Sequence, residues 1–232
     1  MKSFIMMGQS NMAGRGEFDD VPEIENPLCS MFRMGRWQKM SEPINPDRAI
    51  FGTIWHSGRS LAASFADCYA KKHKEQIGLI PCADGGTSIN QWLPGKPDFN
   101  YAMAMAELAK ASSDICGILW HQGETDCARG ELCGYFDKLA LVINTARKTV
   151  SDDTLPVIMG ELSENENAEN RETHILFNKR LHDFADGMSN ITVVSSAELT
   201  MKPDRLHFDS KSLRIFGERY FEAYEKLTEV KE

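Results

Sequence analysis

A serine near the start of the chain stands where a nucleophile could be presented. Ser10 lies in the segment Gly8-Gln-Ser-Asn11, directly after the apolar run 4–7, which predicts a buried strand. On a tight strand-to-helix turn the Ser10 hydroxyl would be exposed, and its backbone N–H would be one of the free donors of a helix start. Attack on an ester needs both features, because the oxyanion must meet preorganised N–H donors. A serine that only caps a helix is the alternative interpretation.

A carboxylate and an imidazole near the end of the chain could activate that serine. Asp204 precedes His207 by three residues. One turn at this spacing can bring the carboxylate to the ring and fix its tautomer, which leaves the other ring nitrogen free to take a proton from a serine. The alternative is that the pair occurs by chance and that Asp204 only caps the last helical region.

The remaining histidines fit the role of base less well. His73, His174 and His182 fall on predicted helices, and His56 has no carboxylate at a useful spacing. His121 lies in a motif loop and stays possible, although its neighbours look more like hydrogen-bonding groups. No two histidines have the spacing of a metal-ligand pair, so we expect neither a metal site nor a cofactor.

Strand-like and helical patterns alternate along the rest of the chain. The expected strands are 28–33, 77–82, 115–120, 156–162 and 191–197, and the expected helices are 60–73, 100–111, 132–150, 172–185 and 210–227. Alternation of this kind predicts an α/β fold: a single-domain, three-layer α/β/α sandwich over residues 1–232 with a mostly parallel central sheet. In such folds ligands bind beyond the carboxyl ends of the strands.

Four glycine-rich or polar segments follow predicted strands and can therefore meet at one rim of the sheet. They are residues 8–11, 85–90, 121–126 and, a few residues after its strand, 204–207. A further segment, 163–171, is rich in Asn and Glu and also follows a strand. We expect it on the same rim as a mobile, solvated loop rather than a functional one.

Composition and charge exclude several classes of function. The chain has 42% hydrophobic and 26% charged residues, which is ordinary for a soluble globular protein. Its net charge of −8 argues against a nucleic-acid or anionic-membrane partner, and no apolar run could span a bilayer.

The start does not resemble a signal peptide, and the six cysteines form no C-x-x-C pair. We therefore expect a cytoplasmic protein with free thiols; a secreted form trimmed at its start is the alternative. The oligomeric state is not visible in the sequence.

Taken together, the motifs resemble the SGNH hydrolase superfamily, in its sialate O-acetylesterase and carbohydrate esterase family 6 (acetylxylan esterase) branch. The resemblance rests on segments 8–12, 85–89 with Trp92, 120–126 and 204–208, in this order, and covers residues 4 to about 224. It implies a flavodoxin-like fold and a serine esterase that removes O-acetyl groups from carbohydrate. The implied partner is a small-molecule or oligosaccharide ester, such as acetylated xylan, an acetylated oligosaccharide or O-acetyl sialic acid.

The resemblance also implies roles for the triad and its loops. Ser10 would be the nucleophile that forms an acetyl-serine intermediate, His207 the general base and then acid, and Asp204 its orienting partner. Glu124 and Asp126 are expected to brace their loop rather than to react.

The implied oxyanion hole consists of two backbone donors and one side chain. They are the backbone N–H groups of Ser10 and Gly86 and the side-chain amide of Gln122, with Gly85 as the alternative to Gly86. A glycine suits this position because a residue without Cβ lets the acetyl oxygen approach the backbone closely. Trp92 is either a wall of the substrate pocket or part of the core.

Three departures from the family pattern affect the choice of substrate. Thr125 stands where Ser is commoner, Gly-Glu-Leu at 160–162 stands where Gly-Gln-Leu is frequent, and residues 56–60 do not match the usual pattern. We expect all three near the sugar.

Other classes of protein fit the sequence less well. The second glycine of the G-x-S-x-G motif of ordinary α/β-hydrolases is missing, and neither phosphate-binding glycine motif is present. A non-catalytic carbohydrate-binding relative would be expected to lose Ser10, His207 or Gln122. An esterase or lipase that acts on non-carbohydrate short acyl esters stays open.

Overall fold

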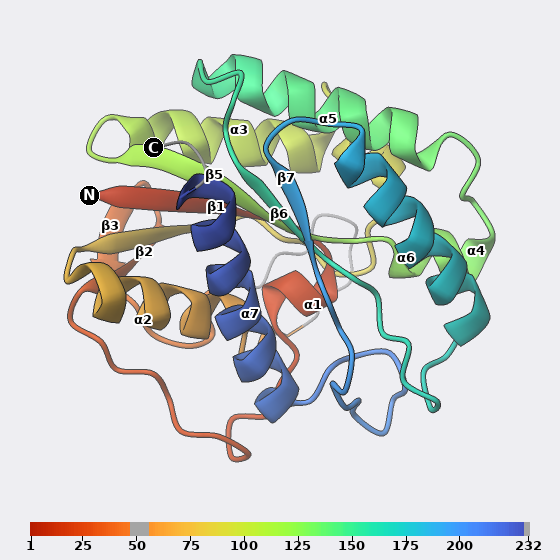
Figure 1. Cartoon of the computed structure of the whole chain (residues 1–232). Coiled ribbons are helices and arrows are strands. Elements are labelled where there is room, and N and C mark those ends of the chain that lie inside the picture. Colours follow the sequence, from red (N-terminus) through yellow and green to blue (C-terminus); the bar gives the residue numbers. More distant parts are fainter. Residues whose placement is uncertain (47–55, 230–232) are drawn as a thin grey trace.

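One twisted sheet forms the centre of the protein, a computed structural model of which describes residues 1–46 and 56–229 (Figure 1). The seven-stranded sheet has the order β3-β2-β4-β1-β5-β6-β7. Its strands are β1 (Lys2–Gly8), β2 (Cys29–Arg33), β3 (Arg36–Lys39), β4 (Ile77–Pro81), β5 (Asp114–His121), β6 (Val157–Gly160) and β7 (Ile191–Val194). The pairs are parallel except for β2 and β3, which form an antiparallel pair at one edge.

Helices cover both faces of the sheet (Figure 1). They are α1 (Ser10–Ala13), α2 (Leu61–His73), α3 (Pro97–Lys110), α4 (Glu124–Arg129), α5 (Tyr135–Val150), α6 (Arg171–Asp186) and α7 (Ser210–Glu229), together with a 3₁₀ helix, η1 (Ile89–Trp92). Helices α3, α5 and α6 pack on one face, and α2 and α7 pack on the other. This arrangement confirms the predicted three-layer α/β fold with a mostly parallel sheet.

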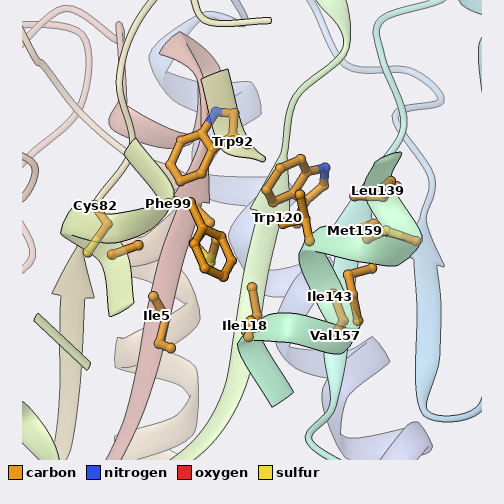
Figure 2. Close-up of a cluster of buried hydrophobic side chains, with 14 of the residues drawn as sticks. Ile5, Cys82, Trp92, Phe99, Ile118, Trp120, Leu139, Ile143, Val157 and Met159 are labelled. Carbon is orange, nitrogen blue, oxygen red and sulfur yellow. The ribbon is translucent and has the colours of Figure 1, made fainter. Parts of the chain in front are cut away.

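The central strand shows why the apolar runs predicted buried strands. Successive side chains of a strand point to opposite faces of the sheet. In β1, Ile5 and Met7 belong to the core beneath α3 and α5, whereas Phe4 and Met6 belong to the core beneath α2 and α7. Figure 2 shows Ile5 in the first of these cores, which also holds Phe99 and Ile118. A strand buried on both faces must be continuously apolar.

The predicted elements are present, and their limits differ by a few residues. Strands β6 and β7 end at Gly160 and Val194, and α5 begins at Tyr135. The sequence reading missed the short helices η1 and α4, which lie inside two of the motif loops. Gly130 and Gly134, at φ 67° and 68°, separate α4 from α5. Left-handed backbone of this kind ends a helix and favours glycine.

The position of β1 determines where the motif loops meet. It lies between β4 and β5, so the loops that follow these three strands leave the sheet side by side. The chain after β7 then returns residues 204–207 to the same rim, where His207 contacts Ser10. The topology therefore brings together four segments that are far apart in the sequence.

Two general features concern the surroundings of the protein. Within residues 1–46 and 56–229, no helix is long and apolar enough to cross a membrane. All six cysteines are free. Burial, reinforced by the nearby Asp67, raises the pKa of the Cys29 thiol to about 12, so this buried cysteine stays an unreactive thiol.

Candidate active site

Ser10, His207 and Asp204 form a continuous chain of hydrogen bonds. The Ser10 hydroxyl lies 2.9 Å from His207 Nε2, and His207 Nδ1 lies 2.8 Å from Asp204 Oδ2. Ser10 is 5% exposed, whereas the side chains of His207 and Asp204 are 17% and 40% exposed. An imidazole held between a hydroxyl and a carboxylate in this way can take the hydroxyl proton and form an imidazolium beside the carboxylate.

The turn that carries Ser10 is held tightly against β5. Gly8 has a φ of 131°, and a Cβ at this position would lie 2.1 Å from the backbone oxygen of His121. Gln9 N–H donates to that same oxygen over 2.8 Å. Only glycine permits this approach of two backbones, and the turn places Ser10 as the first residue of α1. No acceptor lies within reach of the Ser10 N–H among the described residues.

Asp204 holds its own loop as well as the imidazole. Its Oδ1 accepts hydrogen bonds from the backbone N–H groups of Leu206 and His207, at 3.0 and 2.9 Å. Burial works against ionisation of Asp204, but the hydrogen bonds from His207 and Leu206 outweigh it and hold the pKa of the carboxyl below its ordinary value. Asp204 therefore faces His207 as a carboxylate.

Gln122 lies behind the wall of the site. It is 2% exposed, and Tyr135 Oη donates to its Oε1 over 2.8 Å. Its NH₂ group faces three acceptors: Asp126 Oδ2 at 2.6 Å, the backbone oxygen of Thr87 at 3.0 Å and Gln9 Oε1 at 3.2 Å. The predicted role of Gln122 as a direct oxyanion donor does not fit this arrangement, because both of its N–H groups are already used.

Gln9 presents the amide that the sequence analysis assigned to Gln122. Its Oε1 accepts from Gln122 Nε2 and from the Thr125 backbone N–H, the latter over 3.3 Å. Gln9 also lines the cavity beside Ser10. The oxygen is thus held by two donors, whereas the NH₂ group donates to no described residue and is left for a ligand in the cavity. The sequence reading missed this residue; the glutamine next to Ser10 was the available signal.

Glu124 and Asp126 make buried hydrogen bonds in the loop after β5. Asp126 is fully buried and accepts from the Ile89 backbone N–H, which ties this loop to η1. The pKa of Asp126 is raised, because the effect of burial exceeds the lowering effect of the hydrogen bonds from Gln122 and Ile89.

Glu124 is the buried partner of His121. Its Oε1 lies 3.3 Å from His121 Nε2 and 2.8 Å from Asn11 Nδ2. Burial alone would raise the pKa of Glu124, but His121 and the hydrogen bond from Asn11 outweigh it and lower the pKa to about 2. His121 is fully buried and does not contact Ser10, so it serves this pair rather than the triad.

A cavity of about 440 Å³ opens in front of Ser10. Its lining includes Gly85 and Gly86 on one side and Arg15, Thr125, Arg129, Glu169 and Asn170 around it. Segment 163–171 therefore does lie on the rim, as predicted, and it contributes to the wall of the cavity. Gly85 and Gly86 both line the cavity. Gly86 has a left-handed φ of 74°.

The structure decides between the two interpretations of Trp92. Trp92 is fully buried and packs edge to face on Trp120 at 5.6 Å (Figure 2), so it belongs to the core and not to the pocket wall. Gly86 has a further reason to be glycine. A Cβ there would meet no protein atom within 4 Å, but the left-handed φ of 74° disfavours other residues.

Of the three departures from the family pattern, only Thr125 lines the cavity. Glu161 instead accepts from the Ser196 backbone N–H and pairs with His182. Arg59, in segment 56–60, forms a buried ion pair with Glu42 at 3.1 Å. The described part of the chain holds no group of three or more His, Cys, Asp or Glu side chains arranged for a metal ion.

The fold and the site define the class of protein. A doubly wound sheet with these loops at its carboxyl edge is the fold of the SGNH, or G-D-S-L, hydrolases. One solved structure with this fold is a member of the lipolytic protein G-D-S-L family from Veillonella parvula, with a TM-score of 0.52 and 13% identity over 97% of this chain and 100% of that one.

The family follows from the sequence match. A family model described as carbohydrate esterase, sialic acid-specific acetylesterase matches residues 1–226, and the chain belongs to this family of carboxylic ester hydrolases. A probable carbohydrate esterase from Arabidopsis thaliana is 27% identical over 241 residues, which covers 95% of this chain and 89% of that protein. Its crystal structure has a TM-score of 0.82 at 24% identity and covers 97% and 98% of the two chains. The structure of NanS has a TM-score of 0.79 at 14% identity and covers 99% and 98%.

Proposed function

We propose that this protein is a serine esterase that removes O-acetyl groups from a carbohydrate through an acetyl-serine intermediate on Ser10. The observation that carries the proposal is the hydrogen-bonded chain from Ser10 through His207 to Asp204 at the mouth of the cavity. Membership in a carbohydrate esterase family supports the same reaction class. A purely sugar-binding protein would have no need of this chain.

In the proposed reaction, His207 transfers one proton in each of two steps. Its Nε2 takes the proton of Ser10 Oγ as that oxygen attacks the acetyl carbonyl carbon. The tetrahedral intermediate then collapses: the bond to the sugar oxygen breaks, and that oxygen takes the proton from His207. A water molecule next attacks the acetyl-serine while His207 takes one of its protons. The bond to Ser10 Oγ then breaks, Ser10 Oγ takes that proton from His207, and acetic acid leaves and ionises in water. Asp204 stays ionised throughout and stabilises the imidazolium.

The proposed oxyanion hole has three donors that line one side of the cavity. They are the backbone N–H groups of Ser10 and Gly86 and the side-chain NH₂ of Gln9, in place of that of Gln122. Each is free of a protein acceptor in the described structure, so each can donate when negative charge develops on the acetyl oxygen. The chain from Tyr135 through Gln122 holds the Gln9 amide in one orientation before the substrate arrives.

The wall of the cavity carries groups that can bind a carbohydrate. Around Ser10 it presents the side chains of Arg15, Arg129, Glu169 and Asn170, which are charged or polar groups able to hydrogen-bond to sugar hydroxyls. Its volume of about 440 Å³ is within the range of small-molecule sites. An O-acetylated mono- or oligosaccharide is therefore the proposed substrate class.

Acetate release from a panel of substrates tests the proposal. The panel comprises acetylated xylan, acetylated mannan, acetylated oligosaccharides and O-acetyl sialic acid, with p-nitrophenyl acetate and p-nitrophenyl butyrate as sugar-free esters. We expect acetate from at least one carbohydrate, with kcat/KM above that for the sugar-free esters, and loss of at least about 10³-fold in kcat in Ser10→Ala. Turnover of the sugar-free esters alone would favour a general short-chain esterase.

A further inference from the structure

The residue after the nucleophile makes contacts that the proposed reaction has not yet used. Asn11 is 1% exposed and belongs to α1. Its Oδ1 accepts from the Phe208 backbone N–H over 3.1 Å, and its Nδ2 donates to the Leu206 backbone oxygen over 3.3 Å. Both ends of one side-chain amide thus bind backbone groups of the segment that carries His207.

These two hydrogen bonds lie on either side of the base. Leu206 and Phe208 are the immediate neighbours of His207, so the hydrogen bonds hold the backbone around His207 to α1, the helix that begins with Ser10. Asp204 also holds this segment, but only from within its own loop. Asn11 is thus the described side chain that links the nucleophile's helix to the backbone on both sides of His207.

Glu124 determines which way the Asn11 amide points. Its Oε1 accepts from Asn11 Nδ2 over 2.8 Å, and a carboxylate can only accept. The NH₂ end of Asn11 must therefore face Glu124, which leaves Oδ1 for the Phe208 N–H. Glu124 is itself 3% exposed and lies beside His121, so this orientation is set by a buried carboxylate.

We propose that Asn11 is a positioning residue for catalysis, which holds His207 at hydrogen-bond distance from Ser10, and that Glu124 acts through Asn11 to the same end. The inference rests on the proposed serine mechanism. Asn11 touches neither substrate nor the reacting atoms. It contributes by keeping the Ser10 Oγ to His207 Nε2 distance short, on which proton transfer depends.

The chain offers a matched control in α6. Asn178 of α6 is 2% exposed and accepts from the Leu162 backbone N–H over 2.8 Å. Its Nδ2 donates to the Leu162 backbone oxygen over 2.8 Å and to Glu164 Oε1 over 2.9 Å. It therefore makes the same three kinds of hydrogen bond as Asn11, but to a segment that carries no member of the triad.

The experiment compares Asn11→Ala, Asn178→Ala and Ser10→Ala with the wild type. Both asparagine variants should lose stability, because each leaves buried backbone groups unpaired. Only Asn11→Ala should also lower kcat, by up to about 10²-fold, with KM little changed, since a small displacement of a catalytic group has an effect of this size. Labelling of Ser10 by a fluorophosphonate should slow by a similar factor, because it also needs the base.

Amide hydrogen exchange gives a readout that does not depend on activity. In the wild type the Phe208 amide should exchange slowly, and in Asn11→Ala it should exchange faster than in Asn178→Ala. If Asn11→Ala does not fold, the wild-type measurement decides: fast exchange of the Phe208 amide would overturn the inference.

The two proposals fail in different ways. Full activity of Ser10→Ala would overturn the serine mechanism and the positioning role with it. An inactive Ser10→Ala together with equal kcat in the two asparagine variants would overturn the role of Asn11 alone.

Discussion

Two polar clusters lie next to each other at the carboxyl edge of β1, and they differ in how far their side chains are buried. The outer cluster consists of Ser10, His207 and Asp204, and the inner cluster of Gln9, Gln122, Asp126 and Tyr135. In the outer cluster the Asp204 side chain is 40% exposed, whereas Asp126 and Tyr135 are fully buried in the inner cluster. The outer groups can exchange protons with one another and with water. The inner groups have almost all their hydrogen-bonding capacity used.

The difference separates reaction from orientation. A triad must reach substrate and water, so it cannot be sealed off, and its members make few contacts that stabilise the fold. The inner cluster needs no access and gains from burial, because hydrogen bonds there face no competition from water. The inner cluster holds the Gln9 amide in a single orientation at the cavity wall. We therefore expect substitutions in the outer cluster to reduce activity, and most of those in the inner cluster to reduce stability first.

The largest effect on activity is expected for the base. His207→Ala should lower kcat by at least about 10³-fold, since no other group takes the Ser10 proton. The unfolding free energy should change by less than about 1 kcal/mol, because the pair of His207 and Asp204 is partly open to water and such pairs contribute little to stability. Acetate release and urea unfolding measure the two quantities. A variant that loses stability while it keeps its turnover would contradict the comparison.

The second prediction separates Gln9 from Gln122. Gln9→Ala should lower kcat by about 10²- to 10³-fold with KM nearly unchanged, as expected for a donor to charge that develops only in the transition state.

Gln122→Ala should lower kcat less, because Thr125 N–H still holds the Gln9 oxygen. It should lower stability more, by about 1–3 kcal/mol for each buried group that it leaves unpaired. The Thr87 backbone oxygen is one such group, whereas Asp126 keeps the Ile89 N–H and Tyr135 keeps the Gln122 backbone oxygen as a partner. The reverse order of the two kcat values would return the oxyanion role to Gln122.

The effect of a chelator tests whether the triad acts without a metal ion. Activity should be the same with and without a chelator. Loss of activity in the chelator, with recovery on adding a divalent ion, would contradict a mechanism that uses only the triad.

The smallest effect concerns Glu124 and stability in acid. Its pKa is lowered from an ordinary 4.5 to about 2, so the folded state holds the ionised form more firmly than the unfolded state does. The resulting stabilisation is fully present above about pH 4.5 and is lost as pH falls towards about 2. Glu124→Gln should therefore lose less unfolding free energy than the wild type over this interval. Parallel curves of unfolding free energy against pH would contradict the assignment.

The sequence predicted which residues would meet, and it did so through local features. The buried strands are continuous apolar runs, and the motif loops directly follow them. Because parallel strands end at one edge of a sheet, Ser10, the glycines 85 and 86 and the segment 121–126 had to approach one another once the strand order was set. The spacing of Asp204 and His207 could likewise be read locally, since their contact closes within one turn.

Only the tertiary structure decided which way the side chains in this region point. Gln9 and Gln122 have the same side chain, and no local pattern tells which amide faces the cavity. The orientation of Gln122 depends on Tyr135 in α5, which lies 13 residues further along the chain. The orientation of Gln9 depends on the N–H of Thr125, which lies 116 residues further along. The placement of Trp92 in the core was likewise decided by the tertiary structure, because its burial depends on Trp120 in β5. The orientation of an amide or a ring is set by its packed neighbours, and these are brought together only when the sheet is formed.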